Sequence, residues 1–89
     1  MIQHTEQRAE RVQQYAQEAA WQRGKARAAV DLADHIAGYD PGHDPGRQLV
    51  GETVIALHAQ ADRCRARAER YDGRIAVLLE LIGAPDGRP

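Results

Sequence analysis

Apolar residues recur along the second half of the chain at spacings that alternate between four and three. No charged residue interrupts the stripe, which comprises Val50, Val54, Leu57, Ala61, Cys64, Ala68, Tyr71, Ile75, Leu78 and Ile82. This a/d pattern is typical of a helix that packs along its whole length against another helix. It predicts one long helix over residues 45–82.

The first third of the chain has the same spacing, with alanine as its main apolar residue. The stripe comprises Thr5, Ala9, Val12, Ala16, Ala19, Arg23, Ala26, Val30, Ala33 and Ala37. It predicts another long helix over residues 5–37, with Thr5 as its N-cap. At a rise of 1.5 Å per residue, each helix is about 50 Å long.

A short segment rich in glycine, proline and aspartate, residues 38–44, separates the two stripes. Gly38 suits the left-handed position that commonly follows the end of a helix. Asp44 is the expected N-cap of the second helix, because Pro45 then takes the first helical position, where proline is favoured. The segment predicts a tight reversal of the chain.

This reversal brings the two stripes together in an antiparallel pair. Positions whose numbers sum to about 86 then face each other, and Arg23 is a charged member of the contact, opposite Cys64. The predicted fold class is all-α: a long, coiled-coil-like antiparallel hairpin of two helices. The hairpin forms a single domain, and the tail at residues 83–89 is expected to fray.

Composition makes the predicted core thin. The 89 residues include 16 alanines, one tryptophan and no phenylalanine, and alanine buries little apolar area. A chain this small with a thin core commonly depends on disulfides or on oligomerisation. Cys64 is the single cysteine, so no disulfide forms within the chain. Oligomerisation is therefore expected, and the lone cysteine favours a reducing compartment, the cytoplasm.

Some apolar residues remain outside the predicted contact. The stretch at residues 75–82 is apolar almost all round, and the far side of the first helix has an apolar stripe of its own. The candidate interface residues are Trp21, Gly24, Ala28, Leu32, Val77 and Leu81. Uncovered patches of this kind mark interfaces, so we predict a homodimer of hairpins that forms an antiparallel four-helix bundle. No apolar run approaches the roughly 20 residues that span a bilayer, and no membrane partner is expected.

Basic residues gather at mid-length of both predicted helices. This basic belt comprises Arg23, Lys25, Arg27, Arg63, Arg65 and Arg67. A belt of this kind is a candidate site for a phosphate ligand or a nucleic acid. The alternatives are a solvated face, or a surface that meets acidic residues of a second subunit. The net charge of −1 and the lack of aromatic residues alternating with the arginines weigh against nucleic acid.

The residue pattern gives little support for a metal site or a catalytic site. Asp31 and His35 share a helical face and Glu52 comes close across the hairpin, but no Glu-x-x-His pair points into the core, as di-iron bundles require. Cys64 has no histidine or acid at heptad spacing to activate it, and the chain contains no serine. No metal, cofactor or catalytic residue is expected.

The sequence therefore predicts a non-enzymatic, homo-oligomeric helical interaction module: a small adaptor, regulator or assembly protein with a protein partner. The alternative is a protein that binds nucleic acid or a phosphate ligand through the basic belt. In length and hairpin shape the chain is similar to the WXG family of small helical hairpins. However, that family places Trp-x-Gly at the turn, whereas Trp21 lies within a helix, and nothing is carried over from the likeness.

Overall fold

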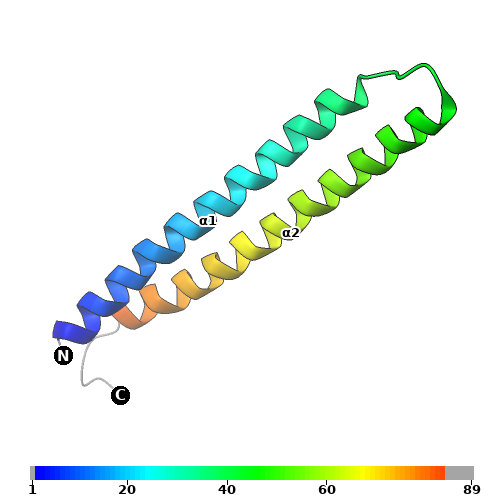
Figure 1. The fold of residues 1–89 in the computed structure, drawn as a ribbon. Helices are drawn as coiled ribbons and strands as arrows, with labels where there is room; N and C mark the ends of the chain where they lie inside the picture. Colours follow the sequence, from blue (N-terminus) through cyan, green and yellow to red (C-terminus); the bar gives the residue numbers. More distant parts are fainter. Residues whose placement is uncertain (1, 84–89) are drawn as a thin grey trace.

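The computed structural model describes residues 2–83, and the side chains of residues 4–83. Helix α1 spans Ile2–Ala37 and helix α2 spans Asp44–Gly83. The two run side by side in opposite directions and form an extended hairpin (Figure 1) that measures 70 × 20 × 13 Å. The predicted all-α hairpin of two long helices is confirmed, while the predicted frayed tail beyond Gly83 lies outside the described residues.

Helix α1 begins earlier than the sequence pattern predicts. It is already helical at Ile2, so Thr5 lies inside the helix and the prediction that it is the N-cap is wrong. Residues 2–8 lack glycine and proline, so nothing in this segment opposes helix formation. Thr5 and Ala9, the first two members of the predicted stripe, are exposed, and the first member at the contact is Val12.

The turn is capped by a residue that the sequence analysis did not select. The backbone N–H of Gly46 donates to Nδ1 of His43 at 3.0 Å, and the N–H of Arg47 donates to the His43 carbonyl at 3.0 Å. His43 is therefore the N-cap of α2, and the assignment of that role to Asp44 is wrong. Asp44 is the first helical residue, and its carboxylate accepts a hydrogen bond from Arg47 Nη1 at 3.0 Å.

A left-handed residue does occur in the turn, but at a different glycine. Gly42 has a φ of 82°, whereas Gly38 has no positive φ, so the expectation for Gly38 is wrong. The Gly42 N–H donates to Asp40 Oδ1 at 2.9 Å, and the same oxygen accepts from Arg47 Nε at 3.1 Å. One carboxylate thus fixes both the loop and the first turn of α2.

Gly46 is expected to resist substitution, although it lies in a helix. A Cβ built there would lie 2.6 Å from the His43 ring and 2.7 Å from Pro41. The Gly46→Ala variant should therefore lose about 1–2 kcal/mol of unfolding free energy, because the capping ring must move. The matched control is Gly51→Ala, where a Cβ meets nothing within 4 Å and a gain of about 0.5–1 kcal/mol is expected. Denaturation monitored by circular dichroism measures both, and equal shifts in the two variants would contradict the prediction.

The contact face of α2 is the one that its apolar spacing selects. Its buried residues are Ala61, Cys64 and Ala68, and the other seven members of the predicted stripe are half-buried. At the centre, Ala61 and Cys64 pack with Ala26 and Ala29 of α1. Small residues on both helices allow their backbones to approach closely there.

The contact face of α1 is rotated relative to the prediction. Val12, Ala19, Ala26, Val30 and Ala33 are at the contact as expected, but most of the alternate positions are shifted by one residue. The contact uses Tyr15, Gln22, Ala29 and Ile36, whereas the predicted Ala16, Arg23 and Ala37 are exposed. The rotation brings a tyrosine and an isoleucine inward in place of two alanines, which buries more apolar area. It also leaves the charged arginine in water, which avoids the cost of burying it.

Candidate functional site

The contact between the helices divides the surface of the hairpin into two long sides. On α2, residues seven apart form straight lines along the helix. The line through Arg65 and Asp72 lies on one side of the contact, and the lines through Arg63 and Arg70 and through Arg67 and Arg74 lie on the other. The candidate residues therefore form two groups, one on each side of the contact.

On the first side, the arginines are largely neutralised by acids. Arg23 forms an ion pair across the hairpin with Asp72, and Arg65 pairs with Asp62 at 3.1 Å within α2. Together with Arg27, these two arginines border a shallow groove of about 320 Å³. Two members of the predicted basic belt thus have carboxylate partners, and Arg23 does not face Cys64.

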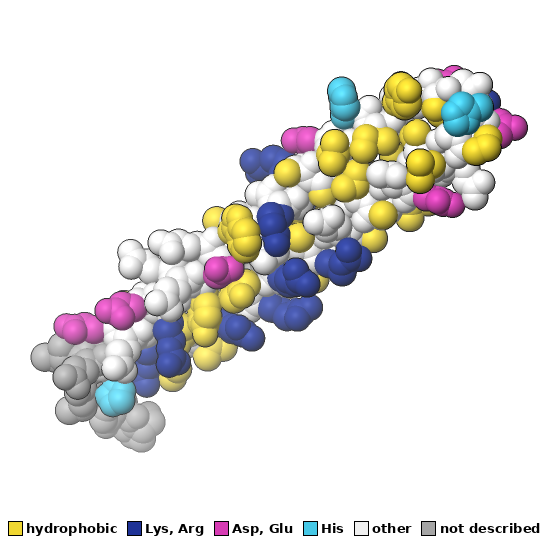
Figure 2. Space-filling view, in the orientation of Figure 1, with side chains coloured by type: hydrophobic (Ala, Val, Ile, Leu, Met, Phe, Trp, Pro, Cys, Tyr) yellow, Lys and Arg dark blue, Asp and Glu magenta, His cyan; other side chains and the backbone are white. Residues whose placement is uncertain are grey.

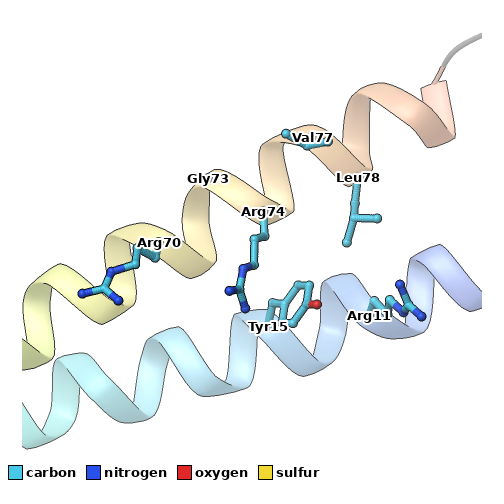
Figure 3. A pocket seen from close by; sticks show the side chains of 7 residues that line it. All are labelled: Arg11, Tyr15, Arg70, Gly73, Arg74, Val77 and Leu78. Carbon is cyan, nitrogen blue, oxygen red and sulfur yellow. The ribbon is translucent and has the colours of Figure 1, made fainter.

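On the second side, a groove of about 480 Å³ lies between the open ends of the helices. Its walls combine apolar surface from Val77 and Leu78 with guanidinium groups. The lining residues are Arg11, Tyr15, Arg70, Gly73, Arg74, Val77 and Leu78 (Figure 3). A smaller hollow of about 230 Å³ continues it towards mid-helix and adds Arg67 and Tyr71. Arginines and tyrosine rings therefore share one continuous depression.

The aromatic rings of this groove are held by stacking. The rings of Tyr15 and Tyr71 lie with centroids 5.6 Å apart, one from each helix. The Arg74 guanidinium carbon is 5.7 Å from the Tyr15 centroid and 5.6 Å from that of Tyr71. In Figure 3 the Arg74 side chain extends towards Tyr15 across the gap between the helices. This cation–π arrangement fixes both the rings and the guanidinium.

The groove residues with charged or aromatic side chains were missed by the sequence analysis as site candidates: Arg11, Tyr15, Arg70 and Arg74. A signal for two of them was present, because Arg70 and Arg74 follow Arg63 and Arg67 at the heptad interval of seven. Arg11 and Tyr15 were hidden because the contact face of α1 was placed one residue away. The rotated face brings Tyr15, instead of Ala16, into contact with Tyr71.

The predicted interface residues are exposed, as their position outside the contact implies. Exposed fractions are 60% for Trp21, 49% for Leu32, 57% for Val77 and 45% for Leu81. Lys25 lies over the Trp21 ring, with Nζ 4.4 Å from its centroid. In Figure 2, Lys and Arg side chains gather over the middle of the hairpin beside hydrophobic ones, while most Asp and Glu lie towards its two ends.

Other kinds of site have little support among the described residues. No group of three His, Cys, Asp or Glu side chains in residues 4–83 is placed to hold a metal ion. Cys64 is a free, buried cysteine at the packed centre. Neither α1 nor α2 is long and apolar enough to cross a membrane.

Comparisons with models of known protein families, with curated proteins and with solved structures find no match for this chain. Any functional conclusion therefore depends on the geometry of the two sides and on the distribution of apolar and charged groups over them.

Proposed function

We propose that this protein is a non-enzymatic helical interaction module that acts as a homodimer, in which two hairpins form a four-helix bundle. One observation carries the proposal. Among residues 4–83, the buried apolar side chains are alanines and Cys64, whereas eight large apolar side chains, Trp21 among them, are 45–71% exposed. A hairpin has only two layers, so its own fold gives these side chains no cover. Burial of part of this surface against a second copy removes apolar area from water, which is favourable in proportion to the area buried.

The turn half of the Trp21 side is where we expect the two copies to overlap. Tyr15 and Tyr71 lie side by side, so residues whose numbers sum to about 86 stand at similar heights. Leu49 therefore lies nearer the turn than Trp21, by roughly 24 Å at 1.5 Å per residue. A two-fold axis midway between them, near Ala28, places Trp21 of each copy on Leu49 of the other.

Small and apolar residues surround this axis. Ala28 and Ala56 are exposed and lie at nearly the same height on the two helices, which allows close approach of the backbones. Leu32 and Leu49, 49% and 63% exposed, add apolar area on either side. The arrangement supports packing of helix pairs at the short distances found in bundles.

Charge favours the same overlap. Lys25 and Arg63 lie at mid-length, whereas Asp31 and Glu52 lie in the turn half. A two-fold axis near Ala28 brings each basic pair close to the acidic pair of the second copy, which is electrostatically complementary. A full-length overlap would instead set the rows of arginines of the two copies against each other, and like charges in contact oppose association.

The proposal does not include catalysis. Cys64 is buried among small side chains, where a thiol acts as a small apolar residue and not as a nucleophile. A free buried thiol also supports a reducing compartment, and on that ground we place the protein in the cytoplasm.

Light scattering on the purified chain tests the dimer. The expected mass is twice the 9.9 kDa of one chain at micromolar concentration. Trp21→Glu should shift the mass towards the monomer, because it puts a carboxylate against the apolar side chain of Leu49 of the second copy. The proposed overlap leaves out Val77 and Leu81, which the sequence pattern assigns to the interface. Val77→Glu is therefore the matched control, since Val77 is about as exposed as Trp21 but lies at the open end, and this variant should stay dimeric.

Circular dichroism of both variants establishes that the helices remain intact. A monomeric wild-type protein at micromolar concentration would overturn the dimer. Dissociation by Val77→Glu to the same degree as by Trp21→Glu would overturn the half-length overlap.

A further inference from the structure

The groove at the open end of the hairpin contains cations without carboxylate partners. Arg11, Arg67, Arg70 and Arg74 have no carboxylate of residues 4–83 within 4.0 Å. Glu18 lies between Arg11 and Lys25 on the same face of α1, but its carboxylate is not within 4.0 Å of any of these arginines. These guanidiniums therefore carry charge that the described part of the hairpin does not neutralise, in a chain whose net charge is only −1.

The four arginines form a row and not a closed cluster. From Arg67 to Arg74 the row climbs about 10 Å along α2 at 1.5 Å per residue, with Arg11 facing it from α1. A compact anion such as free phosphate requires donors that converge on one point. A row suits a linear polyanion, whose charges are spaced along a chain.

Aromatic rings lie beside the row. Tyr15 and Tyr71 are half-buried; Tyr15 lines the groove and Tyr71 lines the hollow next to it. Proteins that bind single-stranded nucleic acids combine a cationic path for the backbone with aromatic rings on which bases stack. An acidic peptide binds through carboxylates, which do not stack on aromatic rings. A duplex hides its base faces and would leave the rings without a partner.

We propose that this groove binds single-stranded nucleic acid, with Arg67, Arg70 and Arg74 on successive phosphates and Tyr15 against a base. A lipid surface fits less well, because the exposed large apolar residues lie beyond the two ends of the row and not in a plane beneath the cations. Arg11 and Arg74 lie outside the part of the hairpin that the proposed dimer would bury, whereas Arg67 and Arg70 stand at its edge. One copy alone forms the whole groove. The inference therefore does not depend on the dimer, and light scattering distinguishes failure of one from failure of the other.

Fluorescence anisotropy with a labelled 12-nucleotide single strand of mixed sequence, as DNA and as RNA, tests the proposal on the whole chain. Three phosphate contacts on a single strand predict a loss of roughly 20-fold in affinity between 50 and 200 mM salt. The double variant Arg70→Gln/Arg74→Gln should bind at least tenfold more weakly. The control Arg27→Gln/Arg65→Gln removes the same charge from the other side and should change affinity less than twofold.

Stacking is tested separately from charge. Tyr15→Leu keeps every arginine and should weaken binding about tenfold, while circular dichroism shows that the helices persist. Anionic vesicles of phosphatidylserine and phosphatidylcholine and an unlabelled duplex of the same length serve as competitors, and neither should displace the strand efficiently. No binding at 50 mM salt, equal weakening by the two double variants, no effect of Tyr15→Leu, or preference for the vesicles or the duplex would each overturn the proposal.

Discussion

Replacing Ala61 by leucine should lower the free energy of unfolding by about 3 kcal/mol, because the two helices leave no room for a larger side chain there. Ala61 is 0% exposed and packs with Ala26, Ala29 and Cys64. Three extra carbon atoms must either push the helices apart or force strained side-chain conformations. Either response loses contacts along neighbouring layers, since the dispersion energy of close packing falls off within a fraction of an ångström.

Chemical denaturation at a fixed protein concentration measures this loss. The concentration is kept constant because association adds to the apparent stability of an oligomer. The matched control is Ala66→Leu, on the same helix at an exposed position, where a change within about 0.5 kcal/mol is expected. A loss at Ala61 no greater than that at Ala66 would mean that the centre of the hairpin is less tightly packed than the structure shows.

The sequence predicted the fold and one of its two contact faces for a definable reason. On α2 the stripe includes bulky residues such as Leu57, Tyr71 and Leu78, and a stripe with these residues has one possible orientation. On α1 alanines occur on several faces, so spacing alone does not distinguish Ala16 from Tyr15. The area buried by a tyrosine decides the orientation, and that comparison requires the partner helix.

In the turn and in the basic belt, too, some features depend on the folded structure and not on the local sequence alone. His43 is an uncommon N-cap, and propensity favours Asp44, but the 3.0 Å bond from Gly46 to the His43 ring follows from the path of the loop. The belt grouped six cations by their height along the hairpin. The structure divides them by side. On α2 this division follows from the contact face that the spacing predicts correctly, whereas on α1 the rotation moves Arg23 out of the contact and onto one side. Side was thus predictable from sequence on α2 but not on α1.

Gln22→Leu should raise the free energy of unfolding by about 1–2 kcal/mol. Gln22 is 6% exposed in the contact between the helices, and its Oε1 is buried without a hydrogen-bond partner among the described residues. A buried acceptor that has lost its water and gained no donor costs roughly 1–3 kcal/mol. Leucine has a similar length and no polar atom, so it removes this cost and adds apolar contact.

Denaturation of Gln22→Leu beside Gln17→Leu, which changes an exposed glutamine one and a half turns away, separates this effect from a general gain in hydrophobicity. Only the variant at Gln22 should gain stability by more than about 0.5 kcal/mol. A loss of stability at Gln22 would contradict the prediction, because it would require the amide to be hydrogen-bonded in solution. A polar residue in a helical contact commonly fixes register and oligomeric state at a cost in stability. If Gln22 has that role, the stabilised variant should also show a less uniform mass in light scattering than the wild-type protein.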